Sequence, residues 1–150
     1  VKRRQEDLGT GRGVTVVDDF AHHPTAVEKT LVALRQRYPG RRMVALFEPR
    51  SLTAGRTFFF DAYREAFAHA DRVLFAPTFH MGRLQEEERL DFANLAGQLT
   101  DAGVPAVVCA DTADVLRRAL EEAREGDVLV TMSSGSFDGM PHRLATALRG

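Results

Sequence analysis

Acidic and imidazole side chains stand close together in the segment Asp18–His23, which reads Asp-Asp-Phe-Ala-His-His. Carboxylates beside imidazoles can bind a nucleotide, hold a metal ion or transfer protons. Each residue type also occurs in ordinary turns, and Thr25 with Glu28 has the spacing of a capping box, which offers a purely structural role for Thr25. Because both carboxylates and both imidazoles gather here, we favour a functional site. Adjacent histidines usually diverge, so we expect at most one of His22 and His23 to face it.

Polar residues also follow two further apolar segments. Phe47 is followed by Glu48-Pro49-Arg50-Ser51, where the planar Arg50 guanidinium suits a carboxylate or a phosphate, with a surface ion pair as the structural alternative. Met132 is followed by Ser133 and Ser134, and hydroxyl and backbone N–H groups in such a turn can hold an anion. A serine nucleophile is disfavoured because the spacing G-x-S-x-G is absent. The three polar segments together indicate a binding site for a multiply charged ligand.

Short apolar segments that predict strands alternate with segments that predict helices. Strands are expected at 14–17, 43–47, 73–75, 105–110 and 128–132, and helices at 24–37, 58–70, 90–101, 111–126 and 140–148. The fourth helix has an N-cap residue in Asp111 and a C′ residue in Gly126. Phe59, Tyr63 and Phe67 recur at helical spacing, which indicates core packing. This alternation predicts a three-layer α/β fold, with a mostly parallel sheet and helices on both faces, and with the polar segments at the carboxyl edge of the sheet.

The N-terminal region predicts a hairpin. Residues 3–8 and 14–17 are strand-like and are joined by a glycine-rich connection at 9–13, so we expect one antiparallel strand and about six strands in all. The glycines do not make a dinucleotide-binding loop, because a strand and not a helix follows them. The sequence contains no G-x-x-x-x-G-K-[ST] motif, so this chain cannot hold a triphosphate in the P-loop manner.

Composition narrows the class of protein. The formal net charge of -1 over 150 residues argues against a general nucleic-acid or anionic-membrane surface. Cys109 is the single cysteine and lies in an apolar run, which predicts a buried thiol and a cytoplasmic setting. No export signal and no apolar run near 18 residues is present. Since the chain begins at Val1 in a charged, strand-like segment, we expect an excised domain of a longer protein.

At these motifs the sequence resembles the C-terminal domain of the Mur ligase family, the ATP-dependent amide-forming enzymes of peptidoglycan synthesis. Residues 1–6 resemble the linker from the central ATPase domain, and 18–25 resemble the motif that opens the C-terminal domain. Segments 47–51 and 132–139 look most like those of members that join L-Ala-γ-D-Glu-meso-diaminopimelate to UDP-N-acetylmuramate in peptidoglycan recycling. The 18–25 motif is shared with the members that add L-alanine, which is the sister alternative.

The resemblance implies a Rossmann-like C-terminal domain at 14–150, preceded at 1–13 by a linker and hairpin from a missing central domain. Its partners would be its own N-terminal UDP-sugar domain and its own central P-loop domain. ATP and Mg²⁺ would belong to the full-length enzyme, and this fragment alone should be inactive and bind neither. The substrates would be UDP-N-acetylmuramate and the cell-wall tripeptide, joined through an acyl phosphate.

The resemblance also implies roles for single residues. Asp19 and His22 would be catalytic and, together with Arg4, would contact the nucleotide. The carboxylates of the incoming peptide would be held by a second set of residues, Arg50, Ser51, Ser133 and Ser134.

Two other classes of protein are alternatives to the Mur ligase hypothesis. A stand-alone metal-dependent hydrolase could use Asp18, Asp19 and His22, but no further spaced histidine or carboxylate pair completes a usual ligand set, so no metal site is expected. A non-catalytic Rossmann-like module that binds a ligand or a protein is the other alternative.

Overall fold

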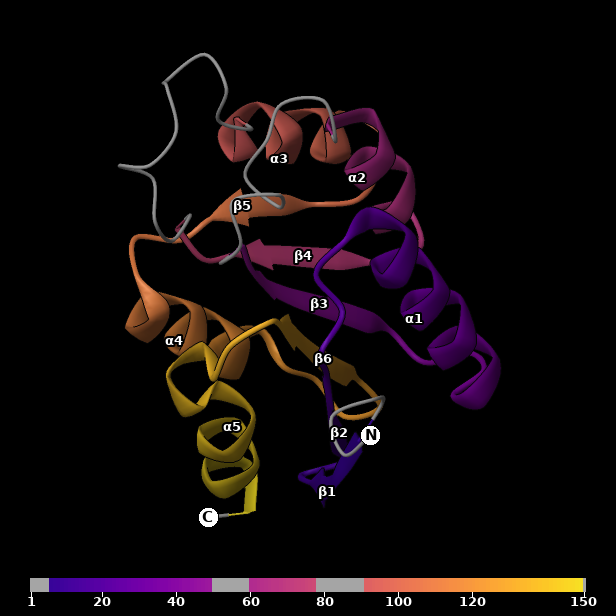
Figure 1. Cartoon of the computed structure of the whole chain (residues 1–150). Helices are drawn as coiled ribbons and strands as arrows, with labels where there is room; N and C mark the ends of the chain where they lie inside the picture. The colour runs from indigo at the N-terminus through magenta and orange to yellow at the C-terminus, as the bar shows by residue number, and fades with distance from the viewer. Residues whose placement is uncertain (1–5, 50–59, 78–90, 150) are drawn as a thin grey trace.

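Six strands form one twisted sheet in the order β1-β2-β6-β3-β4-β5 (Figure 1). The computed structural model describes residues 6–49, 60–77 and 91–149. Only the pair β1 and β2 is antiparallel, and the other neighbours are parallel. The strands are β1 (Glu6–Gly11), β2 (Val14–Asp19), β3 (Met43–Glu48), β4 (Arg72–Phe75), β5 (Ala106–Val108) and β6 (Val128–Ser133). The predicted α/β class with one antiparallel N-terminal strand is therefore confirmed.

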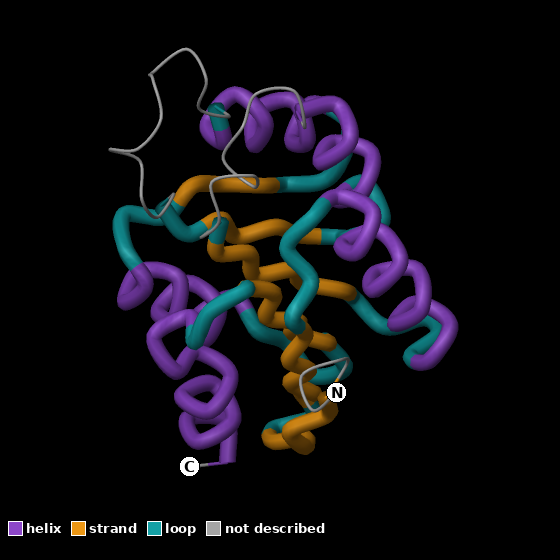
Figure 2. Tube along the Cα trace, in the orientation of Figure 1, coloured by secondary structure: helices purple, strands orange, loops and turns teal. Residues whose placement is uncertain are grey.

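Helices cover both faces of the sheet, which makes three layers (Figures 1 and 2). The helices are α1 (Pro24–Arg37), α2 (Phe60–Phe67), α3 (Phe92–Asp101), α4 (Thr112–Glu122) and α5 (Met140–Arg149), with a 3₁₀ turn, η4 (Phe137–Gly139), before the last. The first three helices share one hydrophobic core with the sheet, and α4 and α5 share the other. None of the described helices combines the length and apolar character needed to cross a membrane.

The predicted helix at 24–37 is confirmed residue for residue, whereas the other boundaries move by a few residues. The largest error concerns α4, which ends at Glu122, with the C-cap Ala123 already in an extended conformation. Gly126, at a φ of 98°, belongs to the turn that leads into β6 and does not end the helix. The predicted N-cap of α4 is confirmed, because the Asp111 side chain accepts from the Asp114 amide at 2.8 Å.

The hairpin turn is shorter than predicted and consists of Arg12 and Gly13 only. Both residues have positive φ, 55° and 75°, as the type I′ turns that suit two-residue hairpins require. The pairing register shifts between Asp7 and Thr10, so the preceding strand carries a β-bulge. Gly11 lies against α5, where an added Cβ would come within 2.7 Å of the Leu148 carbonyl oxygen. The hairpin is thus fitted to the last helix of the chain.

Aromatic side chains fill the core between the sheet and the first three helices. Phe47 on β3 lies 5.3 to 5.5 Å, between ring centroids, from Tyr63 and Phe67 on α2, and all three side chains are fully buried. Phe75 and Phe92 complete the cluster. The predicted core packing of Tyr63 and Phe67 is confirmed, while Phe59 lies outside the described residues.

Candidate functional site

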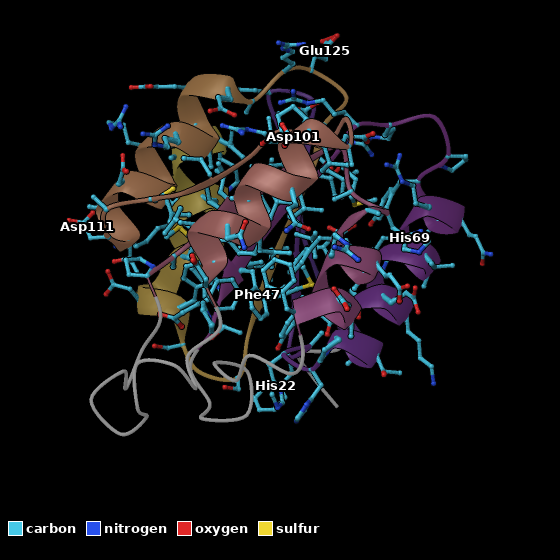
Figure 3. All side chains as sticks on the ribbon, turned by 90° about the horizontal axis from the view of Figure 1, so that it is seen from above. His22, Phe47, His69, Asp101, Asp111 and Glu125 are labelled. Carbon is cyan, nitrogen blue, oxygen red and sulfur yellow. The ribbon has the colours of Figure 1, made fainter. Side chains whose placement is uncertain are left out.

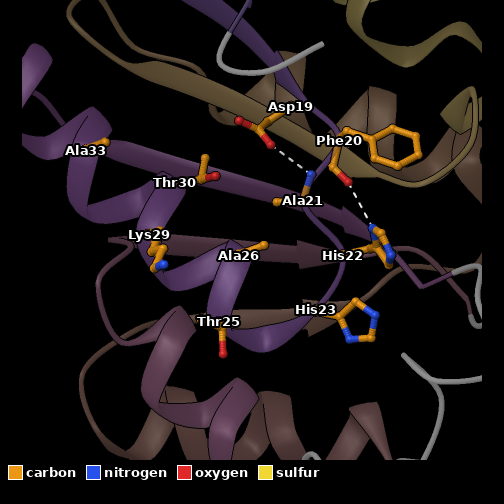
Figure 4. A pocket seen from close by; sticks show the side chains of 10 residues that line it. All are labelled: Asp19, Phe20, Ala21, His22, His23, Thr25, Ala26, Lys29, Thr30 and Ala33. Atoms are coloured by element: carbon orange, nitrogen blue, oxygen red, sulfur yellow. Dashed lines mark hydrogen bonds between the residues drawn. The ribbon is translucent and has the colours of Figure 1, made fainter. Parts of the chain in front are cut away.

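A cavity of about 840 Å³ opens where β2 ends and α1 begins (Figure 4). Figure 3 places His22, at this edge, and Glu125, in the turn before β6, at opposite ends of the molecule, with Phe47 between them. The cavity is lined by Asp19, Phe20, Ala21, His22, His23, Thr25, Ala26, Lys29, Thr30 and Ala33. The carboxyl end of a parallel strand thus provides the ligand-sized cavity, as the position of the polar segment predicts.

The two adjacent aspartates point to opposite faces of the sheet, because side chains alternate along a strand. Asp19 lies on the α1 side, is 4% exposed, and accepts from the Ala21 amide at 2.8 Å through Oδ1. Asp18 lies on the other side and accepts from the Thr131 hydroxyl at 2.8 Å. The two carboxylates therefore do not share one site. Within the described residues no group of three His, Cys, Asp or Glu side chains is placed so that it could hold a metal ion.

Both imidazoles line the cavity, although the sequence predicts that at most one would do so. Their ring centroids are 4.7 Å apart, and His22 Nδ1 lies 3.0 Å from the Phe20 carbonyl oxygen (Figure 4). Partial burial and, to a lesser degree, the neighbouring His22 lower the pKa of His23. A neutral His23 imidazole can accept a proton near pH 7, whereas an imidazolium could only donate.

Residues of α1 supply the rest of the cavity wall, and the sequence pattern does not predict them as site residues. Lys29 contributes an exposed ammonium and Thr30 a hydroxyl, one turn beyond Thr25 and Ala26 on the same helix face. The spacing of three and four residues from Thr25 and Ala26 is the sequence feature that indicates their place on this face of the helix. Phe20 is the large hydrophobic side chain exposed among the described residues, at 44%, and its ring packs edge-on against His22.

The predicted capping box is wrong. The N-cap of α1 is His23, whose side chain makes no capping bond, and Pro24 is the first helical residue. Thr25 is therefore already inside the helix and exposed towards the cavity. Glu28 points to His69 near the end of α2, at 3.4 Å. Pro24 makes a side-chain cap less necessary, because its nitrogen has no N–H to satisfy.

A second polar group lies on the opposite face of the sheet, at the same edge. Ser133, fully buried at the end of β6, donates to Glu48 Oε1 at 2.7 Å and accepts from the Gly135 amide at 3.0 Å. Ser134 is half-buried beside it. A hydroxyl has one proton, so Ser133 would have to leave Glu48 before it could donate to a peptide carboxylate.

Three of the predicted site residues, Arg4, Arg50 and Ser51, lie outside the described residues. Of the others, Asp19 and His22 both line the cavity, whereas Ser133 bonds to Glu48 on the far side of the sheet and Ser134 follows the end of β6. The roles given to all of them stay predictions.

A family sequence model described as "Mur ligase, glutamate ligase domain" matches residues 3–135. A UDP-N-acetylmuramate–L-alanine ligase of Verminephrobacter eiseniae is 37% identical over 140 residues, which is 93% of this chain and 29% of that protein. The chain thus spans about three-tenths of the length of the curated relatives it matches.

Two solved structures agree with that match. A murein peptide ligase of Psychrobacter arcticus 273-4 superposes with a TM-score of 0.81 at 32% identity, covering 99% of this chain and 30% of that one. A domain described as coming from a UDP-N-acetylmuramate:L-alanyl-γ-D-glutamyl-meso-diaminopimelate ligase of Haemophilus ducreyi 35000HP gives a TM-score of 0.71 at 32% identity, covering 97% of this chain and 99% of that one.

Proposed function

The chain belongs to the Mur ligase family, and from this membership we propose that it is the C-terminal domain of an ATP-dependent amide ligase. The proposed enzyme joins L-Ala-γ-D-Glu-meso-diaminopimelate to UDP-N-acetylmuramate in peptidoglycan recycling, in the cytoplasm. The observation that carries the proposal is the cavity at the end of β2, which is lined by a carboxylate, two imidazoles and the Lys29 side chain. The partners are the N-terminal and central domains of the same enzyme.

The proposed reaction has two steps. The muramyl carboxylate attacks the γ-phosphorus of ATP, which forms an acyl phosphate and releases ADP. The peptide amine then attacks the acyl carbon, an amide bond forms, and inorganic phosphate leaves while the amine loses its proton. Enzymes gain most of the rate of such steps from positioning and from stabilising the charge that develops.

Side chains of the cavity suit one part of this chemistry. The buried Asp19 carboxylate can accept from ribose hydroxyls, and His22 and Lys29 can face phosphate oxygens. A neutral His23 could take up the proton that the attacking amine loses. ATP phosphates and Mg²⁺ would be held mainly by the central domain, because this chain has no P-loop motif and its described residues offer no metal-binding group.

We also propose that the amine substrate is the tripeptide and not free L-alanine. Solved structures at 32% identity include a murein peptide ligase, whereas the relative in Verminephrobacter eiseniae, at 37% identity, is an L-alanine ligase. The segments 47–51 and 132–139 favour the tripeptide. Turnover with free L-alanine and with the tripeptide, measured side by side, decides between the two, and a clear preference for L-alanine would reverse our choice.

The test of the nucleotide role uses the domain joined to its N-terminal and central domains. Asp19→Ala should lower ligation by at least about tenfold, because it removes a charge that faces the nucleotide. Asp19→Asn, which keeps an acceptor for the Ala21 amide, separates loss of charge from loss of the turn. Asp61→Ala, at a side chain that is 80% exposed on α2, is the matched control. Near-normal turnover of both Asp19 variants would show that the proposed role is wrong.

A further inference from the structure

The loop that carries the two imidazoles is tied to α2 through the side chain of Tyr63. Tyr63 on α2 donates its hydroxyl proton to the carbonyl oxygen of His22 at 2.5 Å, across 41 positions of the chain. Within the loop, the Ala21 amide donates to Asp19 Oδ1 and His22 Nδ1 lies 3.0 Å from the Phe20 carbonyl oxygen. Tyr63 therefore connects the His22 backbone to the body of the domain.

The donor itself is held rigidly. The Tyr63 side chain is fully buried and lies in the aromatic cluster, 5.5 Å from Phe47, 6.0 Å from Phe67 and 6.1 Å from Phe92 between ring centroids. A ring packed on several sides leaves its hydroxyl few positions, since buried side chains interlock at crystal-like density. Burial also raises the pKa of this hydroxyl, so it stays a donor over the whole neutral range.

We infer that Tyr63 is a positioning residue, which sets where the His22 and His23 imidazoles lie in the cavity although its own ring lies in the core. The hydroxyl meets His22 at the backbone, and His23 is the next residue and the N-cap of α1. A shift of the His22 carbonyl would therefore move both rings relative to Asp19. The effect on ligation rests on the proposed function, whereas the effect on the imidazoles does not.

The first test is made on the 150-residue chain by NMR. Tyr63→Phe keeps the ring and removes the donor, and we expect it to shift the imidazole resonances of His22 and His23. Tyr38→Phe is the matched control, because Tyr38 also donates its hydroxyl, to Asp7 at 2.7 Å, and neither residue lines the cavity. Unchanged His22 and His23 resonances in Tyr63→Phe would overturn the inference.

Loss of packing must be separated from loss of the hydrogen bond. Phe67→Leu loosens the same aromatic cluster and leaves the Tyr63 hydroxyl in place, so it should lower stability without reproducing the imidazole shifts. Equal shifts in Phe67→Leu and Tyr63→Phe would assign the effect to packing and refute a positioning role.

The hydrogen bond can also be tested by NMR on the unsubstituted protein. We expect the Tyr63 hydroxyl proton to exchange slowly with water and to show cross-relaxation with the backbone of His22 or His23. Rapid exchange of this proton would contradict the hydrogen bond.

The second test is made on the full ligase. Tyr63→Phe should lower kcat by about tenfold and leave KM for the tripeptide within about twofold, since misplaced catalytic groups slow the chemistry more than they weaken binding. Tyr38→Phe should leave both unchanged. If the unsubstituted ligase does not join the tripeptide at all, the proposed function fails and the NMR result still stands. If ligation proceeds and Tyr63→Phe has normal kcat, the catalytic part of the inference fails alone.

Discussion

Ser133→Ala should destabilise the domain measurably, although serine-to-alanine changes are usually mild. The Ser133 hydroxyl donates a hydrogen bond to the Glu48 carboxylate, which is 5% exposed, and Ser133 itself is fully buried. A hydrogen bond to a charged group contributes roughly 1.5–3 kcal/mol, and water cannot easily replace a donor lost at a buried carboxylate. The same substitution removes the acceptor of the Gly135 amide. We therefore expect a loss of about 2 kcal/mol in the free energy of unfolding.

Urea unfolding of the 150-residue chain measures this loss, and thermal unfolding should show a Tm lower by about 4–8 °C. Ser136→Ala is the matched control, because Ser136 is exposed, lies in the same turn and makes no capping bond with its side chain. Its expected effect is within about 0.5 kcal/mol. A double-mutant cycle with Glu48→Gln should give a coupling of about 1 kcal/mol or more, because the two residues share one bond.

A Ser133→Ala variant as stable as Ser136→Ala, with no coupling to Glu48, would refute the reasoning. In that case the hydroxyl would contribute nothing to the fold, and its predicted role in binding a peptide carboxylate would gain support. A destabilised variant that still binds the tripeptide normally would instead leave Ser133 with a structural role only.

Three further predictions concern titration and ion pairing. Asp127→Ala should cost about 3 kcal/mol in urea unfolding, because it removes the buried carboxylate that lies 3.1 Å from the Arg42 guanidinium and accepts from the Arg124 amide. A loss below about 1 kcal/mol would contradict this. Burial raises the pKa of the Cys109 thiol from 9.0 to about 11, so the native state favours the neutral thiol. The contribution of this thiol to the free energy of unfolding is therefore fully present below about pH 9 and is lost as the pH rises through 11. Unfolding of Cys109→Ala between pH 8 and 11 should lack that component, and an identical pH dependence in both proteins would rule it out. Finally, NMR titration should find the pKa of His23 below 6.5, and His22→Asn should raise it part of the way back, because it removes the neighbouring charge while the burial stays. No rise in the variant would leave burial as the whole cause.

Local chemistry allowed much of the fold to be predicted from the sequence. The helix Pro24–Arg37 has a proline at its start and a buried stripe at Val27, Leu31 and Leu34, and these signals need no tertiary information. The ends of α4 could not be predicted in the same way. Gly126 satisfies the rule for a C′ residue, but the turn that hydrogen-bonds to Gly13 and leads into β6 uses it instead.

The candidate site also has features that the sequence predicts and features that depend on how the elements pack. The order of residues alone predicts that polar residues follow β2, β3 and β6, and the structure places the carboxyl ends of these parallel strands at one edge of the sheet. Which elements lie on each face of the sheet, and therefore which groups each side chain contacts, follows from the three-dimensional packing. Strand alternation sends Asp19 to the α1 cavity and Asp18 to Thr131.

Contacts between segments far apart in the sequence decided the rest. Tyr63 has a core residue's spacing, yet its hydroxyl reaches the His22 carbonyl, and Lys29 joins the cavity only because α1 lies beside the end of β2. Periodicity reports whether a side chain is buried, since burial follows from the face of a helix or strand. It carries no information about which partner a buried polar atom finds, because that depends on how the elements pack against one another.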